Sequence, residues 1–354
     1  MALREKPTTI SSFSSWLIFR EGSSVLSEVR ICKSEGVSLK WLHEMISLMT
    51  RIYYQARPLL SRWVRLYFRR RLMRRQRART IDTWPIDPQS ADTRPPWKTW
   101  PDNKRFSVVL THDVKCESGL EKCLQLMEIE QQAGVRSSFN FVAEKYVTPP
   151  DLRKKLTEQG FEVGVHGLLN DGKLYNSNEI FRERAIRINQ TLHDWGALGF
   201  RSPSMHHNLE WLHQLNILYD ASTFDTDPFE PDHSGVQTIF PFWVPGPEEN
   251  GGYIELPYTL PQDSSLFLFL QEKTINIWKQ KLDWIAKNRG MVLINTHPDY
   301  MNFSSKKPRG LMYPADFYRQ FLDYLASEYR GLYWLALPRE MAEFAKDEYR
   351  KIGW

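Results

Sequence analysis

The chain has 354 residues, 42% of them apolar and 13% aromatic, so it can bury a substantial core and is not a disordered chain. Its three cysteines, Cys32, Cys116 and Cys123, fit neither a disulfide framework nor a zinc pattern, which indicates reduced thiols. No run approaches the roughly 18 apolar residues of a membrane span, and the first residues do not resemble a secretory signal. We therefore expect a cytoplasmic location.

Positive charge is concentrated in one segment. The net charge is +5, yet residues 51–80 contain eleven arginines and no Asp, Glu or Lys, so the rest of the chain taken together is net negative. A helix opening at Pro58 would place five apolar side chains on one stripe with arginines around it: Leu60, Trp63, Val64, Tyr67 and Phe68. Such a helix over residues 58–75 suits an anionic membrane surface, although the stripe could equally dock on the folded body. Nucleic acid is a weaker candidate, because no nucleic-acid-binding fold accompanies the arginines.

The composition predicts three regions. Residues 1–80 are expected to form a basic, helical N-terminal extension. Residues 81–104 are rich in proline and are expected to be an extended linker. Residues 105–354 alternate strand-like and helix-like segments and are expected to form one α/β domain.

Within the third region, short apolar runs predict eight strands. They are "FSVVLT", "SSFNFV", "FEVGV", "LGFRSP", "YDASTF", "YIELPY", "MVLINT" and "LYWLAL". Helical patterns are expected between them, at about residues 118–134, 150–160, 178–195, 273–288 and 314–329. This alternation is typical of parallel strands with outer helices. No glycine-rich dinucleotide loop follows the first run, which favours a barrel or distorted barrel over an open sheet.

Five of these runs are followed by polar side chains that can do chemistry: Asp113, His166, Arg201, Asp225 and His297. Any one of them alone could be an ordinary polar residue where a strand meets a loop. Because the carboxyl ends of parallel strands meet at one mouth of a barrel, we expect them to share a single site.

The stretches "LTHDV", "EVGVHGLLNDGKLY", "GFRSPS" and "LINTHPDY", in this order, resemble the polysaccharide deacetylase family, the fourth carbohydrate esterase family, over about residues 100–345. "STFDTDPFEP" and "ELPYTLPQD" are similar to stretches of bacterial exopolysaccharide and lipopolysaccharide-cluster deacetylases. The resemblance implies a distorted (β/α) barrel over residues 105–354. It also implies a hydrolase that removes acetyl groups from N-acetylated sugars in surface polysaccharide or lipopolysaccharide metabolism.

The same resemblance implies a role for each matched residue. Asp113 matches the general base that activates water, and Arg201 matches the residue that orients this base. His297 matches the general acid that protonates the leaving amine, and Asp225 lies where a group that tunes the acid is expected. An amide needs such a base and acid on either side of its carbonyl group. Candidate substrate-binding residues are Trp243, in a Pro/Gly-rich segment where a ring could stack on a sugar, Tyr258 and Lys115.

The metal site is where the sequence departs from the family, which holds its metal with one Asp and two His. His166 matches the first histidine, but Lys115 and Asn170 occupy the other two ligand positions. One imidazole beside an ammonium is a poor site for a divalent cation, so the zinc expected of the family is not expected here. Substitute ligands could come from nearby residues: Asp171, His206 and His207.

Two functions stay open on this basis. The first is an N-deacetylase whose substrate is an N-acetylated sugar or polysaccharide. The second is a catalytically silent, metal-free relative that binds carbohydrate. The retained Asp113, Arg201 and His297 favour the first, and the lost metal ligands favour the second.

Overall fold

The computed structural model describes residues 62–230, 235–247, 251–304 and 310–353. Residues 61–354 form one compact unit. The expected helix start at Pro58 and the expected stripe residue Leu60 lie outside the described residues. Within those that are described, no helix combines the length and apolar character needed to cross a membrane.

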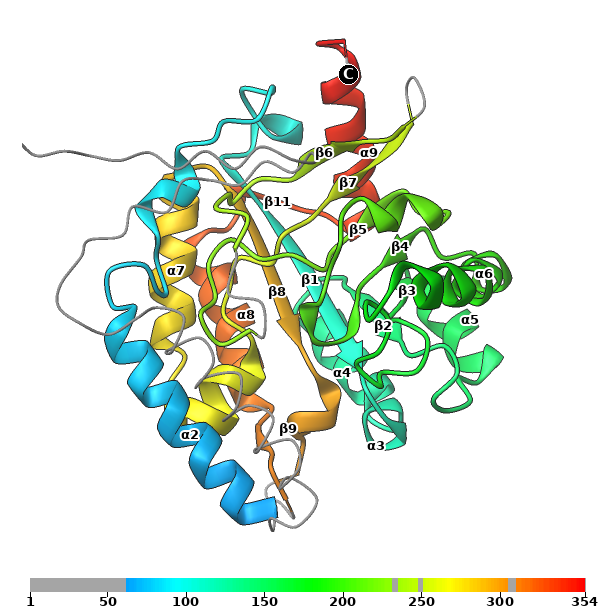
Figure 1. Cartoon of the computed structure of the whole chain (residues 1–354). Coiled ribbons are helices and arrows are strands. Elements are labelled where there is room, and N and C mark those ends of the chain that lie inside the picture. Colours follow the sequence, from blue (N-terminus) through cyan, green and yellow to red (C-terminus); the bar gives the residue numbers. More distant parts are fainter. Residues whose placement is uncertain (1–61, 231–234, 248–250, 305–309, 354) are drawn as a thin grey trace, which may run out of the picture. The chain divides into compact units, whose positions relative to one another are not determined.

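A curled sheet of mostly parallel strands forms the centre of this unit (Figure 1). Its order is β11 (Tyr333–Leu335), β1 (Phe106–Val114), β2 (Ser138–Phe141), β3 (Glu162–Val165), β4 (Gly199–Phe200), β5 (Tyr219–Asp220), β7 (Gly252–Glu255) and β6 (Phe242–Pro245). The remaining strand, β8 (Met291–Thr296), pairs with β1 in parallel. Among the described strands of this sheet, β6 alone runs antiparallel, against β7, and the sequence pattern did not predict it.

The sheet is a distorted barrel because one side is closed without a strand ladder. The backbone N–H groups of Thr259 and Leu260 both donate to the carbonyl oxygen of Leu293 in β8, at 3.0 and 3.1 Å. This irregular segment therefore bridges β7 and β8. The fold is the distorted (β/α) barrel that the sequence predicted.

Helices follow most of the strands, as the alternating pattern predicted. They are α3 (Glu117–Leu120), α4 (Cys123–Gln132), α5 (Pro150–Glu158), α6 (Asn178–Trp195), α7 (Asn276–Lys287), α8 (Asp316–Glu328) and α9 (Pro338–Arg350). In Figure 1, α7 and α8 lie on the β8 side of the sheet, and α5 and α6 lie beyond β3. The bounds of α6 match the sequence pattern because its caps are strong: Ser177 Oγ accepts from the N–H of Ile180, and Gly196 adopts φ 62° at the end.

Shorter elements connect these helices and strands. Two-residue strands β9 (Met301–Asn302) and β10 (Tyr313–Pro314) pair with each other. Short 3₁₀ turns are η1 (Pro88–Ala91), η2 (Pro101–Asn103), η3 (Pro203–Met205), η4 (Trp211–Gln214) and η6 (Pro298–Tyr300). A π-helical segment, η5 (Ser264–Leu270), follows Asp263 and was not predicted.

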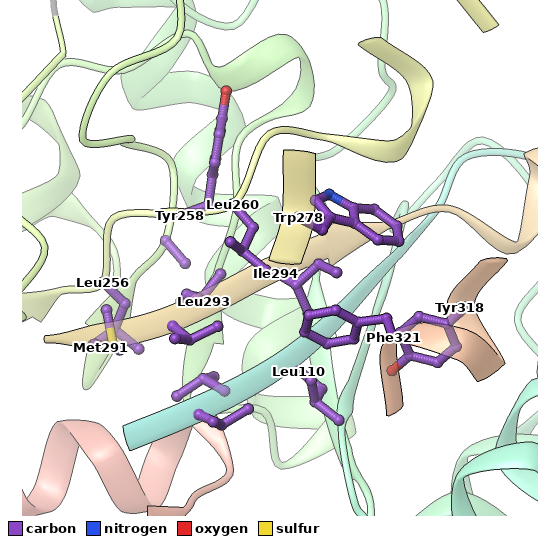
Figure 2. Close-up of a cluster of buried hydrophobic side chains, with 14 of the residues drawn as sticks. Leu110, Leu256, Tyr258, Leu260, Trp278, Met291, Leu293, Ile294, Tyr318 and Phe321 are labelled. Atoms are coloured by element: carbon purple, nitrogen blue, oxygen red, sulfur yellow. The ribbon is translucent and has the colours of Figure 1, made fainter. Parts of the chain in front are cut away.

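The core surrounds β1 and β8. All nine residues of β1 and all six of β8 are buried, which explains why their middle parts, 108–110 and 291–294, are apolar at successive positions rather than alternating. Figure 2 shows Leu293 and Ile294 of β8 between side chains from α7 and the segment after β7 on one side and from β1 and α8 on the other. The site described below is thus held by strands that are fixed on both faces.

Residues 81–104 pack on the barrel instead of forming the extended linker that their prolines predicted. Trp84, Trp97 and Trp100 in this segment are buried. Trp100 also donates its indole N–H to the carbonyl oxygen of Arg289 at 2.8 Å. Burial of three indoles stabilises this packing, and that gain outweighs the preference of proline-rich sequence for an extended chain.

The arginine-rich segment forms the helix α2 (Arg62–Arg79), which packs against η5. Arg70 Nε donates to the carbonyl oxygen of Leu268 at 3.0 Å, and the Arg77 guanidinium pairs with Glu272 at 2.5 Å. The expected helix is present, and the described stripe residues Trp63, Val64, Tyr67 and Phe68 are exposed, so of the two alternatives left open the stripe does not take the one in which it docks on the barrel.

Candidate active site

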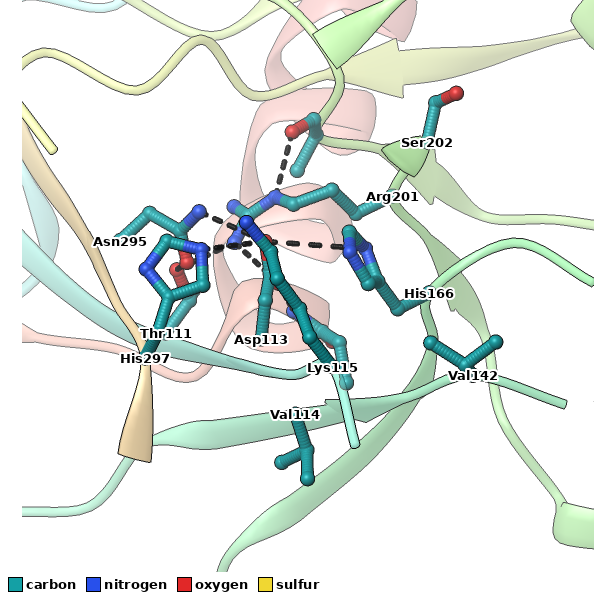
Figure 3. Close-up of polar contacts among 12 residues, drawn as sticks. Thr111, Asp113, Val114, Lys115, Val142, His166, Arg201, Ser202, Asn295 and His297 are labelled. Atoms are coloured by element: carbon teal, nitrogen blue, oxygen red, sulfur yellow. Dashed lines mark hydrogen bonds and ion pairs between the residues drawn. The ribbon is translucent and has the colours of Figure 1, made fainter. Parts of the chain in front are cut away.

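The site begins at the carboxyl end of β1, in the stretch Thr111–Lys115. Alternation along the strand places Thr111 and Asp113 on one face and His112 on the other. His112 therefore points away, where its ring nitrogens contact Thr296 Oγ1 at 2.7 Å and Glu130 Oε1 at 2.9 Å. Asp113 is buried at the centre of the polar cluster drawn in Figure 3.

Three side chains donate to the Asp113 carboxylate. Oδ1 accepts from Asn140 Nδ2 at 3.0 Å and from Arg201 Nη1 at 3.2 Å, and Oδ2 accepts from Asn295 Nδ2 at 2.8 Å. Oδ1 thus has two donors, whereas Oδ2 has one and keeps a lone pair for a further partner. Asn140 and Asn295 are site residues that sequence reasoning missed, although each is an amide near the end of an apolar strand.

The charge state of Asp113 follows from its neighbours. Burial alone would raise the pKa of this carboxyl group. His166, Arg201, His297 and Lys115 outweigh burial and hold its pKa well below the usual range. Asp113 is therefore a carboxylate at any physiological pH.

Arg201 orients this carboxylate from the end of β4. Its Nε donates to the carbonyl oxygen of Ala221 at 2.7 Å, and its Nη1 donates to Thr111 Oγ1 at 2.7 Å as well as to Asp113. A guanidinium fixed at three points positions its partner with little freedom.

His297 follows β8 and is held by an aspartate that the sequence did not single out. Its Nδ1 lies 2.6 Å from Asp263 Oδ1, and its backbone N–H donates to Asp263 Oδ2 at 2.8 Å. Tyr313 also donates to Asp263 Oδ2, at 2.9 Å. The other ring nitrogen, Nε2, lies 4.0 Å from Asp113 Oδ2 and has no hydrogen-bond partner among the described residues.

The expectation that Asp225 tunes the acid His297 is wrong, because Asp263 is the aspartate that contacts His297. Asp225 Oδ2 pairs with Lys281 Nζ at 2.5 Å, so its carboxylate is engaged by α7 rather than by His297. Burial raises the pKa of Asp225 to about 6 despite the opposing effect of Lys281. The aspartate that contacts the histidine is Asp263, the last residue of the stretch "ELPYTLPQD".

Lys115 points into the site. Figure 3 shows its side chain beside Asp113, with the imidazoles of His297 and His166 on either side. Burial would lower the pKa of this ammonium group, but Tyr300, Asp113 and Asp263 outweigh burial and raise it. Lys115 therefore places a positive charge where the resemblance to the family expects a metal-binding carboxylate.

The donor set does not fit a divalent metal ion. His166 Nδ1 lies 3.8 Å from Asp113 Oδ2, and the ammonium group of Lys115 lies beside these two groups, where it would repel a divalent cation. Residues 166–170 form no helical turn, and Asn170 adopts φ 52°, so the expected relation between positions 166 and 170 is absent.

The substitute ligands left open do not complete the site either. Asp171 is engaged by Arg184 in two contacts of 2.8 Å, and His207 Nδ1 contacts the carbonyl oxygen of Met205 at 3.0 Å. Over residues 62–230, 235–247, 251–304 and 310–353, no three His, Cys, Asp or Glu side chains gather as a metal site would need.

A pocket opens between the loops that follow β3 and β4, and its lining begins at Leu168, two residues after His166. Its lining is Leu168, Leu169, Asn170, Asp171, Gly172, Leu174, Tyr175, Arg184, Ser202, Pro203 and His206. These loops lie at the carboxyl ends of their strands, where ligands of barrel folds bind.

Two predicted substrate contacts lie elsewhere. Trp243 is 9% exposed and lies in β6, where its ring faces the Lys346 ammonium at 5.9 Å, so it cannot stack on a sugar. Tyr258 is fully buried, and its hydroxyl lies 2.9 Å from Asp227 Oδ2 and 3.0 Å from Glu230 Oε1. Both aromatic rings are part of the hydrophobic core.

The contacts of the Tyr258 hydroxyl imply that one of its two partners, Asp227 or Glu230, is protonated. A hydroxyl group carries one hydrogen and can donate to only one of two carboxylates. One of the two carboxyl groups must therefore hold a proton for both contacts to be favourable. Burial, followed by the nearby Asp227, raises the pKa of Glu230 to about 8, so Glu230 is the group that holds it near neutral pH.

We expect Glu230→Gln to flatten the pH dependence of stability. Because the folded-state pKa of Glu230 is raised, its contribution is full below the unfolded pKa and is lost as pH rises through about 8. The free energy of unfolding of the wild type should fall by roughly 2 kcal/mol more than that of the variant between pH 6 and pH 9. Urea unfolding at both pH values measures this. Glu158→Gln, at an exposed position of α5, is the matched control, and equal slopes for wild type and Glu230→Gln would contradict the assignment.

The fold that carries this site at its strand carboxyl ends also occurs in solved structures of other proteins. Two solved structures described as polysaccharide deacetylases share it. One, from Mycobacterium smegmatis, has a TM-score of 0.55 and 19% identity over 72% of this chain and 95% of that chain. The other, from Pseudomonas aeruginosa PAO1, has a TM-score of 0.55 and 15% identity over 76% and 99%.

The same barrel occurs in a solved structure named Puue allantoinase, with a TM-score of 0.55 and 15% identity over 76% of this chain and 98% of that chain. No protein-family model matches the chain, and no curated protein matches it. At these identities the likeness establishes the fold. The resemblance to polysaccharide deacetylases therefore holds at the level of the fold, and activity is a separate question.

Proposed function

We propose that the protein is a polysaccharide deacetylase-like hydrolase that removes the acetyl group from an N-acetylated sugar without a divalent metal ion. The observation that carries this proposal is the pair formed by Asp113 Oδ2 and His297 Nε2, 4.0 Å apart in a buried site at the strand ends. A carboxylate with a remaining lone pair and an unpartnered imidazole nitrogen are the base and acid that amide hydrolysis needs.

The proposed reaction uses the two groups in turn. Asp113 takes a proton from a water molecule while the water oxygen attacks the acetyl carbon. The carbon–nitrogen bond of the resulting tetrahedral species then breaks, and His297 gives a proton to the leaving nitrogen. Acetate and a free amine are the products, and transfer of the proton from Asp113 to His297 restores both groups. Asp263 keeps the imidazole oriented and stabilises its protonated form.

Lys115 supplies the positive charge in this scheme. Its ammonium group lies beside Asp113 and between the two imidazoles, where it can stabilise the oxygen that becomes negative during attack. A single charge does this less well than a divalent cation. It also helps to hold the pKa of Asp113 low, which makes that carboxylate a weaker base. We therefore expect slow turnover.

The pocket between the loops after β3 and β4 is the proposed place for the sugar ring. Its lining combines the apolar Leu168 and Leu174 with the polar Asn170 and Tyr175, a mixture suited to a sugar. The proposal requires the N-acetyl group of a ring in this pocket to extend to Asp113, which does not itself line the pocket.

A second candidate is the silent relative that binds carbohydrate without hydrolysing it. The specific observation in its favour is the low basicity of Asp113, which already accepts three hydrogen bonds and is surrounded by cationic or imidazole groups that hold its pKa low. Both candidates bind an N-acetylated sugar and differ only in turnover.

Incubation of the full chain with an N-acetylated glucosamine oligomer tests the proposal. Release of acetate together with an equal amount of free amine is the expected result. Binding of the oligomer, measured by calorimetry, with no acetate released would favour the silent relative. Neither binding nor release would contradict both candidates.

A further inference from the structure

The outward face of α2 carries an unusual set of exposed side chains. Its exposed apolar residues are Trp63 (69% exposed), Val64 (38%), Tyr67 (58%), Phe68 (56%) and Leu72 (64%). The spacing of these residues places them on one side of the helix, and we call them the α2 stripe. Exposure of two large aromatic rings and a tryptophan on one helix face costs free energy in water, so the stripe indicates an interaction surface.

The α2 stripe is not the face by which α2 packs on the barrel. The opposite face of the helix makes that contact. Leu66 and Met73 are buried there. Arg70 and Arg77 bond to Leu268 and Glu272. The helix is therefore held in place with the stripe pointing outward.

Positive charge flanks the stripe. α2 contains no acidic residue, and five of its arginines are exposed: Arg69, Arg71, Arg74, Arg75 and Arg79. Arg71 contacts the Tyr67 hydroxyl at 3.5 Å, so a guanidinium lies directly beside the aromatic stripe. The surface thus combines apolar rings with cations at close range.

We propose that α2 binds the surface of an anionic lipid bilayer, with the stripe in the interface and the flanking arginines on lipid phosphates. A bilayer surface accepts both components, since aromatic rings favour the region between headgroups and acyl chains and cations favour anionic lipids. A nucleic acid would satisfy the arginines but leave the rings in water. A second copy would place arginine-rich helices against each other at a cost in repulsion.

This inference does not depend on the proposed function. Binding of α2 to a bilayer would, however, fix how the active site is oriented relative to the membrane. α2 packs on η5, whose first residue follows Asp263, the partner of His297. Figure 1 shows the N-terminal end of α2 at the same end of the domain as the carboxyl end of β1. A bilayer bound at that end of α2 would therefore lie near the end of the barrel that carries the site.

Sedimentation of the full chain with lipid vesicles tests the proposal. We expect binding to vesicles of equal parts phosphatidylcholine and phosphatidylglycerol, and at least tenfold weaker binding to phosphatidylcholine alone. The triple variant Trp63→Ser/Tyr67→Ser/Phe68→Ser should bind the anionic vesicles at least tenfold more weakly. Its matched control is Val147→Ser/Ile186→Ser/Ile352→Ser, which removes three other exposed apolar side chains (83, 70 and 56% exposed).

The charge component has its own variant. Arg71→Gln/Arg75→Gln changes two exposed arginines and should weaken binding by about fivefold per arginine at low salt. Equal binding to both vesicle types, or unchanged binding of the triple variant, would overturn the proposal. The proposal would also be overturned if the chain formed concentration-dependent dimers and did not bind vesicles. It would likewise be overturned if equimolar duplex DNA displaced the chain from the vesicles.

Discussion

Asp113→Asn should abolish acetate release, with a loss of at least about 10³-fold in kcat/KM. The amide has the shape of the carboxylate but cannot take a proton from water. The variant also removes the negative charge between Arg201 and Lys115, so the free energy of unfolding should fall by about 3–5 kcal/mol. Acetate release and urea unfolding measure the two effects separately.

A matched control separates lost chemistry from lost stability. Asp225→Asn removes another buried carboxylate, one that pairs with Lys281 away from His297. It should destabilise the fold to a similar extent and leave turnover per folded molecule unchanged. Acetate release by Asp113→Asn at the rate of Asp225→Asn would show that Asp113 is not the base.

Asp263→Asn should lower amide hydrolysis by about 10²-fold, because the imidazole of His297 loses the charge that stabilises its protonated form. The amide group can still accept the backbone N–H of His297, so the local fold has a partner. The informative readout is the leaving group. An activated aryl acetate expels a phenolate that needs no proton, and its hydrolysis should fall by a much smaller factor.

Tyr313→Phe is the graded control for this experiment. It removes one hydrogen bond to Asp263 Oδ2 and leaves the carboxylate in place, so it should cost less than Asp263→Asn on the amide. Equal losses on amide and aryl ester in Asp263→Asn would mean that Asp263 supports folding or binding and not proton donation by His297.

The sequence was most informative where strands end. The strand-end rule placed Asp113, His166, Arg201 and His297 together, and in the structure the last three lie 3.8, 3.2 and 4.0 Å from the carboxylate of Asp113. The same rule failed for Asp225, because β5 has only two residues and ends at Asp220, well before position 225. The chain beyond a short strand has no fixed direction that a sequence pattern can supply.

Other features depended on tertiary contacts. Asp263 lies at the start of a π-helical segment that no periodicity indicated, so its contact with His297 was not predictable from spacing. The prolines of residues 81–104 suggested an extended chain, whereas the indoles of Trp84, Trp97 and Trp100 determine where that chain lies. For α2 the helix was predictable, but which face is buried depends on tertiary contacts, in which Arg70 bonds to Leu268 of η5 and Arg77 pairs with Glu272 just after η5.

The cytoplasmic location and the sugar remain predictions. The central claim of the proposed chemistry is that hydrolysis needs no divalent metal ion. Lys115 and His166 occupy positions where the resemblance expects metal ligands. The proposal requires the protein to work with the ammonium of Lys115 and without a divalent ion.

Acetate release from an N-acetylated glucosamine oligomer by wild type and Lys115→Met, each dialysed against a strong chelator, tests this claim most directly. The proposal predicts that the wild type keeps its activity after dialysis and gains nothing from added zinc, and that Lys115→Met loses about 10²-fold or more. Activity that disappears with the chelator and returns with zinc, or a Lys115→Met variant as active as the wild type, would contradict it.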